Sequence, residues 1–240
     1  RFEEALAAIN KFLSKEKLNP NSKKTAEERK QNYEFAVAYA KKHSLKNYSF
    51  VPENLGENIN SPTSEYFPTL TIDGNELVFT RNIGNEDFYS SRAANNNWNK
   101  AEPLKGNINT EQNEGAQMIS ADGQMLVFTG CNRKDGAGSC DLYFSFLSEQ
   151  SWSEAMNAGP RINSEYWESQ PSLSPDKRDL YFVSNRPGGY GGIDIYVSHF
   201  ENGRWSMPEN LGPNINTAGD EQCPFIHADN QTLFFTSDKL

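Results

Sequence analysis

Apolar residues in the first part of the chain recur at intervals of three and four, which is the spacing of one face of an α-helix. Within residues 2–15 these are Phe2, Ala5, Leu6, Ile9, Phe12 and Leu13. A second helix is expected from near Ala26 to about residue 43, because residues 25–28 have the order of a helix capping box. The pattern therefore predicts a helical hairpin at the start of the chain.

From residue 50 onward the pattern changes to short apolar runs separated by turn residues. In the stretch 170–216, strands are expected at residues 171–174 and 180–184, of which the second is apolar throughout. A third strand is expected over residues 193–200, which are rich in β-branched and aromatic side chains. An Asn-Gly turn then leads into a fourth strand at Trp205. This stretch predicts one unit of four antiparallel strands.

The same unit recurs with a period of about 50 residues, as in the blades of propellers. The copies share turn aspartates Asp73, Asp122, Asp176 and Asp229, second-strand phenylalanines Phe79, Phe128, Phe182 and Phe235, and fourth-strand tryptophans Trp98, Trp152 and Trp205. We interpret these residues as structural. The sequence predicts a mainly β fold, a β-propeller of four-stranded antiparallel blades that is incomplete in this chain, with an N-terminal α-helical hairpin.

Two domains are expected, a helical hairpin at residues 1–45 and the propeller at residues 46–240. Residues 50–60 match the end of a repeat, so the propeller is expected to begin with the last strand of a blade. The fourth repeat ends at Leu240, after its second strand. We therefore expect the propeller to be truncated in that repeat and the parent protein to be longer at both ends.

Composition excludes some classes of partner. The formal net charge of −9 argues against nucleic acid, which needs a basic footprint, and against an electrostatic attraction to anionic lipid. The hydrophobic content is 36% and the mean hydropathy is −0.76, as suits a β protein rich in polar turns. Every apolar run is too short to span a bilayer.

Two of the three cysteines bracket the variable loop of the second repeat. The two ends of this loop join neighbouring strands, so we expect Cys131 and Cys140 to form a disulfide, which implies an oxidising compartment such as the periplasm. Two reduced thiols are the alternative. A zinc site is disfavoured, because the nearby residues include no His and no further Cys pair. Cys223 is interpreted as a small buried hydrophobe.

A basic residue follows the second strand of every repeat, on the face that carries the loops between strands two and three. These residues are Arg81, Arg133, Arg186 and Lys239. They are candidates for a partner-binding face. The alternative is local, with each basic residue paired to the glutamate that begins its own repeat.

The residues do not form a catalytic pattern. The three histidines occupy non-equivalent positions of the repeat, and no Gly-x-Ser-x-Gly elbow of a hydrolase occurs. The Gly-rich residues 187–192 lead into a strand, so they lack the helix N-terminus that a phosphate loop uses. The Asp-Gly pairs suit turns, and no EF-hand calcium loop is found. We expect a non-enzymatic protein without catalytic residues, metal or cofactor.

The motif PSLSPDKRDLYFVSNRPGGYGGIDIYVS, followed by GRWSMPENLGPNIN, resembles the PD40 (WD40-like) β-propeller repeats of TolB-like proteins and of Bacteroidetes envelope proteins. The resemblance covers residues 50–240. Residues 2–20, FEEALAAINKFLSKEKLNP, also resemble the tail of a tetratricopeptide repeat, although a plain helical cap on the propeller would fit as well. This combination is similar to PorE-like, OmpA-family periplasmic proteins of the type IX secretion system.

The resemblance implies a periplasmic, outer-membrane-associated scaffold that binds other envelope or secretion-system proteins. Peptidoglycan would be reached only through an OmpA-like domain that this segment does not include. One alternative is a propeller that binds or gates the substrate of a peptidase or glycan-active enzyme. Another is a TolB-like component of envelope integrity.

Overall fold

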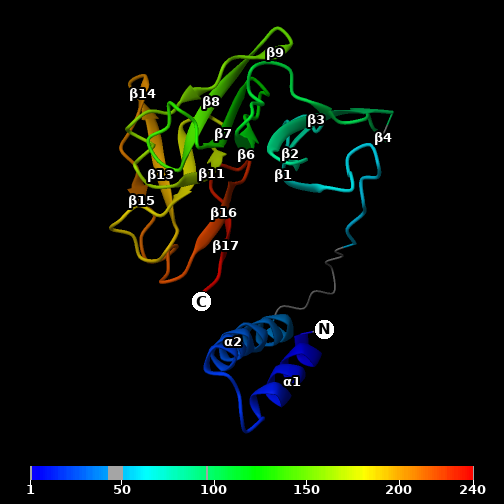
Figure 1. Ribbon diagram of the computed structural model, residues 1–240, viewed down its shortest axis with the longest axis vertical. Helices are drawn as coiled ribbons and strands as arrows, with labels where there is room; N and C mark the ends of the chain where they lie inside the picture. The colour runs from blue at the N-terminus through cyan, green and yellow to red at the C-terminus, as the bar shows by residue number, and fades with distance from the viewer. Residues whose placement is uncertain (1, 43–50, 96, 240) are drawn as a thin grey trace. The chain divides into compact units, whose positions relative to one another are not determined.

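The computed structural model describes residues 2–42, 51–95 and 97–239 (Figure 1). Contacts within the chain divide it into two compact units, residues 1–53 and 54–239, here called the helical unit and the propeller unit. The boundary expected between residues 45 and 46 lies within residues 43–50, outside the described residues.

The helical unit contains α1 (Phe2–Leu13) and α2 (Pro20–Lys42). An ion pair of 3.6 Å between Lys41 Nζ and Glu3 Oε1 joins the end of α2 to the start of α1, so the helices are antiparallel. The expected start of the second helix near Ala26 is wrong. The backbone N–H of Asn21 donates to the Asn19 side chain (2.9 Å), and a helix capped by Asn with Pro at its first position begins six residues earlier.

In the propeller unit, the described strands form antiparallel sheets that follow the order of the chain. Blade 1 contains β1 (Ser64–Leu70), β2 (Glu76–Asn82), β3 (Glu86–Ala94), β4 (Asn97–Trp98) and β5 (Glu102–Pro103). Blade 2 contains β6 (Asn113–Ile119), β7 (Met125–Cys131), β8 (Cys140–Ser148), β9 (Ser151–Trp152) and β10 (Met156–Asn157). Blade 3 contains β11 (Glu168–Leu173), β12 (Asp179–Ser184), β13 (Asp194–Glu201), β14 (Arg204–Trp205) and β15 (Glu209–Asn210), and blade 4 contains β16 (Glu221–Ile226) and β17 (Leu233–Ser237).

The outer strand expected in each complete blade is split into two short segments that both pair with the third strand. In blade 3 the interruption falls between β14 and β15. There the His199 N–H donates to the Ser206 hydroxyl (2.9 Å), and Pro208 has no N–H to offer. A side-chain contact and a missing donor thus interrupt the ladder of this outer strand.

The first strands lie next to one another at the centre of the unit, because β6 contacts both β1 and β11, and β11 contacts β16 (Figure 1). The predicted mainly β fold, with propeller blades and N-terminal helices, is confirmed.

Each first strand contains a bulge at the same place, where the register with the second strand shifts. A residue in the left-handed region marks each bulge: Phe67 (φ 50°), Ala116 (φ 47°), Gln170 (φ 54°) and Cys223 (φ 53°). The buried position expected for Cys223 is wrong, since this residue is exposed. It stands at a bulge and lines a cavity between the first strands.

The recurring aromatic residues occupy equivalent places. Phe79, Phe128 and Phe182 are buried, and each stacks on a third-strand tyrosine at an interplanar angle of 24°. The tryptophan of each complete blade faces the preceding blade or segment. Trp205, for example, is stacked on Phe144 of blade 2, with ring centroids 5.9 Å apart. Aromatic burial therefore joins neighbouring blades.

Candidate functional site

A buried glutamate connects the loop that enters a blade to the first two strands of that blade. In blade 3, Glu168 Oε1 lies 3.1 Å from Arg186 Nη2, and the glutamate side chain is fully buried. Ser164 donates to this carboxylate from its N–H (2.7 Å) and its hydroxyl (2.6 Å), and the Ser184 hydroxyl donates at 2.7 Å. Arg186 also donates to the Ile162 carbonyl (2.7 Å). We call this arrangement the Glu–Arg staple.

The staple recurs in blades 1 and 2. Arg81 Nε lies 2.9 Å from Glu65, and Arg133 Nη1 lies 2.9 Å from Glu114. Each arginine also lies over the third-strand tyrosine of its blade, with guanidinium-to-ring distances of 4.4 Å (Arg81 and Tyr89), 4.7 Å (Arg133 and Tyr143) and 5.0 Å (Arg186 and Tyr196). The staple therefore combines an ion pair with a cation–π contact.

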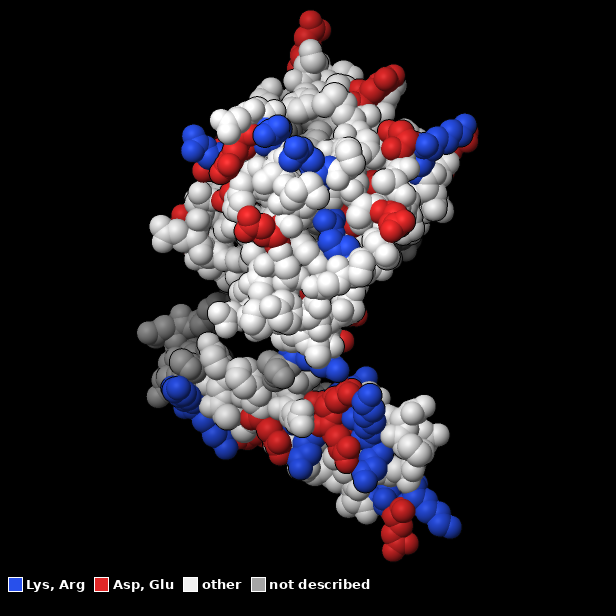
Figure 2. All heavy atoms as spheres, turned by 90° about the vertical axis from the view of Figure 1, so that its left-hand side faces the viewer, with Lys and Arg blue, Asp and Glu red and all other residues white. Residues whose placement is uncertain are grey.

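Three of the four basic residues considered as a partner-binding face are largely buried. The side chains of Arg81, Arg133 and Arg186 are only 12%, 15% and 16% exposed, whereas Lys239 is exposed in blade 4. The face of the propeller unit in Figure 2 shows positive and negative side chains interspersed. The contacts of the three arginines are those of blade-internal staples.

The turn aspartates hold the turns between the first and second strands. Asp122 accepts hydrogen bonds from the Ser120 hydroxyl (2.5 Å) and the Gln124 N–H (3.2 Å), and Lys177 Nζ of blade 3 lies 2.5 Å from it. The hydrogen bond from Lys177, followed by that from Ser120, lowers the pKa of Asp122 to about 2. Asp122 therefore both closes its own turn and links blade 2 to blade 3.

This environment predicts how Asp122 titrates. Its lowered pKa means that the pair with Lys177 stabilises the fold above the ordinary pKa of 3.8 and loses this effect as the pH falls toward 2. In a carbon-detected NMR titration we expect a midpoint near pH 2, rising toward the ordinary value in Lys177→Met. Asp176, whose pKa is lowered chiefly by Ser174, should titrate unchanged in that variant. An Asp122 midpoint that does not move would contradict the assignment.

The disulfide lies in blade 2. Cys131 and Cys140 are opposite one another in the β7–β8 register, and a disulfide joins them with an S–S distance of 2.02 Å. It closes the loop that also carries Arg133 of the blade 2 staple. Asp141, next to Cys140 on β8, accepts hydrogen bonds from the N–H groups of the loop residues Ala137 (3.0 Å) and Gly138 (3.3 Å). Burial nevertheless raises the pKa of Asp141.

Loss of the disulfide should destabilise the propeller unit. For a closed loop spanning about nine residues, chain entropy gives roughly 2–3 kcal/mol. We expect the double variant Cys131→Ser/Cys140→Ser to unfold at a lower temperature than the wild type, and a reductant to lower the unfolding temperature of the wild type but not that of the double variant. Cys223→Ser is the matched control and should behave as the wild type. Equal stability of the double variant and the wild type would show that this bridge does not constrain the chain.

Glycines in the loops between second and third strands allow close approach to the next blade. A Cβ on Gly138 would lie 1.8 Å from the Tyr166 carbonyl oxygen, and one on Gly191 would lie 1.9 Å from that of Gly219. At these contacts Ser139 donates to Tyr166 (3.0 Å). Backbone packing thus accounts for these two glycines, in line with the interpretation that residues 187–192 are shaped for loop geometry.

A motif whose role the sequence analysis missed is the asparagine that enters each new blade. The Leu142 N–H donates to Asn163 Oδ1 (2.8 Å), and Asn163 Nδ2 donates to the Leu142 carbonyl (3.0 Å). Asn109 with Phe88 and Asn216 with Ile195 make the same two bonds, always over a separation of 21 residues. The constant spacing was visible in the sequence, but only the third-strand backbone shows what the asparagine binds.

Two hollows are candidates for binding sites. A cavity of about 260 Å³ lies among the first strands and is lined mainly by apolar side chains, including Phe67, Met118 and Phe225. Two glutamine side chains bridge neighbouring first strands there. Gln117 donates to the Phe67 carbonyl (2.6 Å), and Gln170 accepts from the Cys223 N–H (2.7 Å). These bonds satisfy backbone groups at the bulges of blades 1 and 4.

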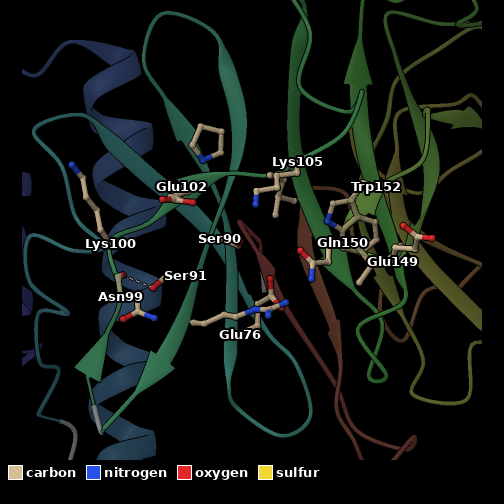
Figure 3. Close-up of a pocket in the computed structure, with 14 residues that line it drawn as sticks. Glu76, Ser90, Ser91, Asn99, Lys100, Glu102, Lys105, Glu149, Gln150 and Trp152 are labelled. Atoms are coloured by element: carbon tan, nitrogen blue, oxygen red, sulfur yellow. Dashed lines mark hydrogen bonds and ion pairs between the residues drawn. The ribbon is translucent and has the colours of Figure 1, made fainter.

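The second hollow, here called the rim groove, lies between the outer strands of blade 1 and the β8–β9 hairpin of blade 2 (Figure 3). Its volume is about 540 Å³, within the roughly 300–1,000 Å³ range of small-molecule sites. Figure 3 shows side chains from both blades around it; they include Glu76, Ser90, Ser91, Arg92, Asn99, Lys100, Glu102, Lys105, Glu149, Gln150 and Trp152. It is the more polar of the two hollows.

Neither hollow contains a metal-ligand cluster. Within residues 2–42, 51–95 and 97–239, no group of three or more His, Cys, Asp and Glu side chains is placed to hold a metal ion. His199 lies 2.7 Å from Asp179 across the β12–β13 pair, away from both hollows. No helix in the described part of the chain is long and apolar enough to cross a membrane.

Comparison with protein-family models and with curated protein sequences gives no match. Among solved structures, the chain is similar to TolB from Acinetobacter baumannii (17% identity, 74% of this chain and 39% of that chain, TM-score 0.51). It is also similar to a protein described as TolB from Agrobacterium tumefaciens (17% identity, 76% of this chain and 57% of that chain, TM-score 0.52). A puromycin-hydrolysing peptidase of Mycobacterium tuberculosis is more distant (16% identity, 75% of this chain and 28% of that chain, TM-score 0.48). The chain thus has a fold similar to TolB-like β-propellers of the PD40 (WD40-like) type and corresponds to less than two thirds of the length of either TolB chain.

Proposed function

We propose that this chain is a non-enzymatic protein-binding module of a periplasmic, outer-membrane-associated assembly in the cell envelope. The observation that carries the proposal is that the recurring polar residues form contacts within and between blades. The Glu–Arg staples, the asparagine pairs and the turn aspartates bind strands and connections together. Repeated fixation of this kind produces a rigid support, and surface loops on a rigid support are suited to binding other proteins.

Two further observations support the compartment and the kind of partner. The Cys131–Cys140 disulfide suits an oxidising environment such as the periplasm. The resemblance to PD40 repeats, together with the tetratricopeptide-like residues 2–20, favours a place among PorE-like, OmpA-family proteins of the type IX secretion system. The partners would then be other secretion or envelope proteins, with peptidoglycan bound by a separate OmpA-like domain.

The test is capture of partners from the envelope. The protein, carrying an affinity tag, is cross-linked in cells and purified from detergent-solubilised envelopes, with a tagged periplasmic protein of equal abundance as control. We expect type IX secretion components to be enriched over the control. Recovery of no envelope protein, or peptide hydrolysis by the purified chain that active-site reagents abolish, would overturn the proposal.

A TolB-like component of envelope integrity is the second candidate, favoured by the fold similarity to the two TolB structures. The same cross-linking experiment separates the two candidates. Recovery of Tol–Pal proteins without secretion components would support the TolB-like function.

A further inference from the structure

The rim groove lies at a place where blade 1 departs from the packing of blade 2. In the strand registers, Ser90 pairs with Glu102 in blade 1, and the equivalent pair in blade 2 is Phe144 with Met156. Phe144 fills the space beneath Trp205 of the next blade, with the two rings parallel within 2°. In blade 1 a serine stands where this ring would be, and the rim groove, which both Ser90 and Trp152 line, lies at this place.

A second departure fixes the edge of the groove. The connection that leaves blade 1 has Lys105 where the other two connections have Gly159 (φ 80°) and Gly212 (φ 76°). The Lys105 carbonyl accepts a hydrogen bond from the Trp152 N–H (2.9 Å). A Cβ on the neighbouring Gly106 would lie 2.2 Å from the Trp152 carbonyl oxygen. The two blades are therefore joined at this point, and the Lys105 side chain is held at the groove (Figure 3).

The charges around the groove are balanced. Its carboxylates belong to Glu76, Glu102 and Glu149, and its basic groups to Arg92, Lys100 and Lys105. Glu76 and Arg92 form an ion pair of 3.2 Å across β2 and β3, whereas the remaining four residues are exposed. A ligand of either single sign would meet equal numbers of attractive and repulsive groups. The groove instead suits a ligand that carries both signs.

Amide, hydroxyl and aromatic groups narrow the class of ligand further. Asn99, Gln150 and Ser90 offer hydrogen-bond donors and acceptors along the groove, as backbone amides require. A sugar ring would also need the face of an exposed aromatic residue to pack on, but Trp152 is only 7% exposed. These features favour a peptide over a glycan.

We propose that the rim groove binds an extended peptide segment of a partner protein, with acidic and basic side chains that pair with Lys100 and Lys105 on one wall and with Glu149 on the other. This proposal rests on the proposed protein-binding function and assigns it a site. It differs from the loop face first considered on the sequence, because the groove lies at the outer strands between two blades.

The test replaces Ser90 with phenylalanine, the residue that blade 2 has at the equivalent position, so that the added ring occupies the groove. Short random peptides displayed on phage are selected on the wild-type chain, and the enriched peptides are synthesised and measured by fluorescence anisotropy. We expect enriched peptides to carry both charges and to shift the indole N–H signal of Trp152 in NMR spectra. Ser90→Phe should weaken their binding by at least about tenfold, the change that corresponds to 1.4 kcal/mol.

Charge-reversal variants keep the proposal testable if Ser90→Phe does not fold. Lys105→Glu and Glu149→Lys should each weaken binding, whereas Arg204→Glu, the reversal of another exposed charge on the outer strand of blade 3, should leave it unchanged. The proposal is overturned if no peptide is enriched, or if the enriched peptides bind all variants equally. It is also overturned if an N-acetylglucosamine oligomer, but no peptide, shifts the Trp152 signal.

The outcomes separate this proposal from the proposed function. If cross-linking recovers the same envelope partners with the wild type and with both Lys105→Glu and Glu149→Lys, the binding function stands and the groove assignment fails. If neither the wild type nor any variant recovers partners, the proposed function itself fails.

Discussion

Replacing Glu168 by alanine is expected to lower the free energy of unfolding of the propeller unit by about 3–5 kcal/mol, because one partner of a buried pair would be left without its counter-charge. Arg186, only 16% exposed, would keep its charge with no carboxylate beside it. The Ser164 N–H and the hydroxyls of Ser164 and Ser184 would also lose their acceptor. Urea unfolding followed by tryptophan fluorescence measures the difference.

Two further variants identify the source of this loss. Glu165→Ala removes an exposed carboxylate from the same loop and should change stability by no more than about 0.5 kcal/mol. In a double-mutant cycle, adding Arg186→Ala to Glu168→Ala should cost much less than Arg186→Ala costs alone, because the two groups form one network. Additive effects would show that the staple is not a coupled unit.

Replacing Gly138 by alanine is expected to destabilise the propeller unit by about 3 kcal/mol, the upper range for overpacking at a tightly packed site. The added Cβ would lie 1.8 Å from the Tyr166 carbonyl oxygen. The obstacle is backbone, so no rotation of a side chain can relieve it. Separating the two segments would also break the hydrogen bond from Ser139 to Tyr166 (3.0 Å). Thermal unfolding of the two proteins gives the comparison.

Gly188→Ala is the matched control for Gly138→Ala. Gly188 has a φ of +93° but no atom within 4 Å of an added Cβ, so its replacement costs only backbone strain, about 1–2 kcal/mol. Gly138→Ala should therefore unfold at the lower temperature. If the order were reversed, backbone conformation and not the contact with the next blade would explain the glycine at 138.

The fold was predictable because each copy of the repeat provides a check on the pattern found in the other copies. The repeat has a Phe and an Asp at constant separation in four copies and a Trp in three of them, which favours equivalent sheets over any other architecture. In the structure, Phe79, Phe128 and Phe182 do occupy equivalent buried places. Local signals were less decisive where two of them competed. The box at residues 25–28 and the pair Asn19-Pro20 are both helix-start signals, and the earlier one begins α2.

The candidate sites depended on distances that the sequence does not contain. Arg81 and Glu65 are 16 residues apart, a spacing that permits either a paired arginine or one free to meet a partner. The two groups are paired because β1 and β2 place them opposite one another in register. The rim groove required the same kind of information. Ser90 and Phe144 each precede the tryptophan of their blade by eight residues, but only the structure shows that Phe144 packs on Trp205 whereas Ser90 lines a groove.

The amino-acid sequence by itself determined the repeat, the strand order and the residues that recur, because each depends on spacing along one chain. Burial, pairing and the rim groove at Ser90 were decided only by the tertiary structure. The physical reason is that the charge of an arginine, or the absence of a ring at a serine, has no fixed consequence until neighbouring blades enclose it or leave it exposed to water.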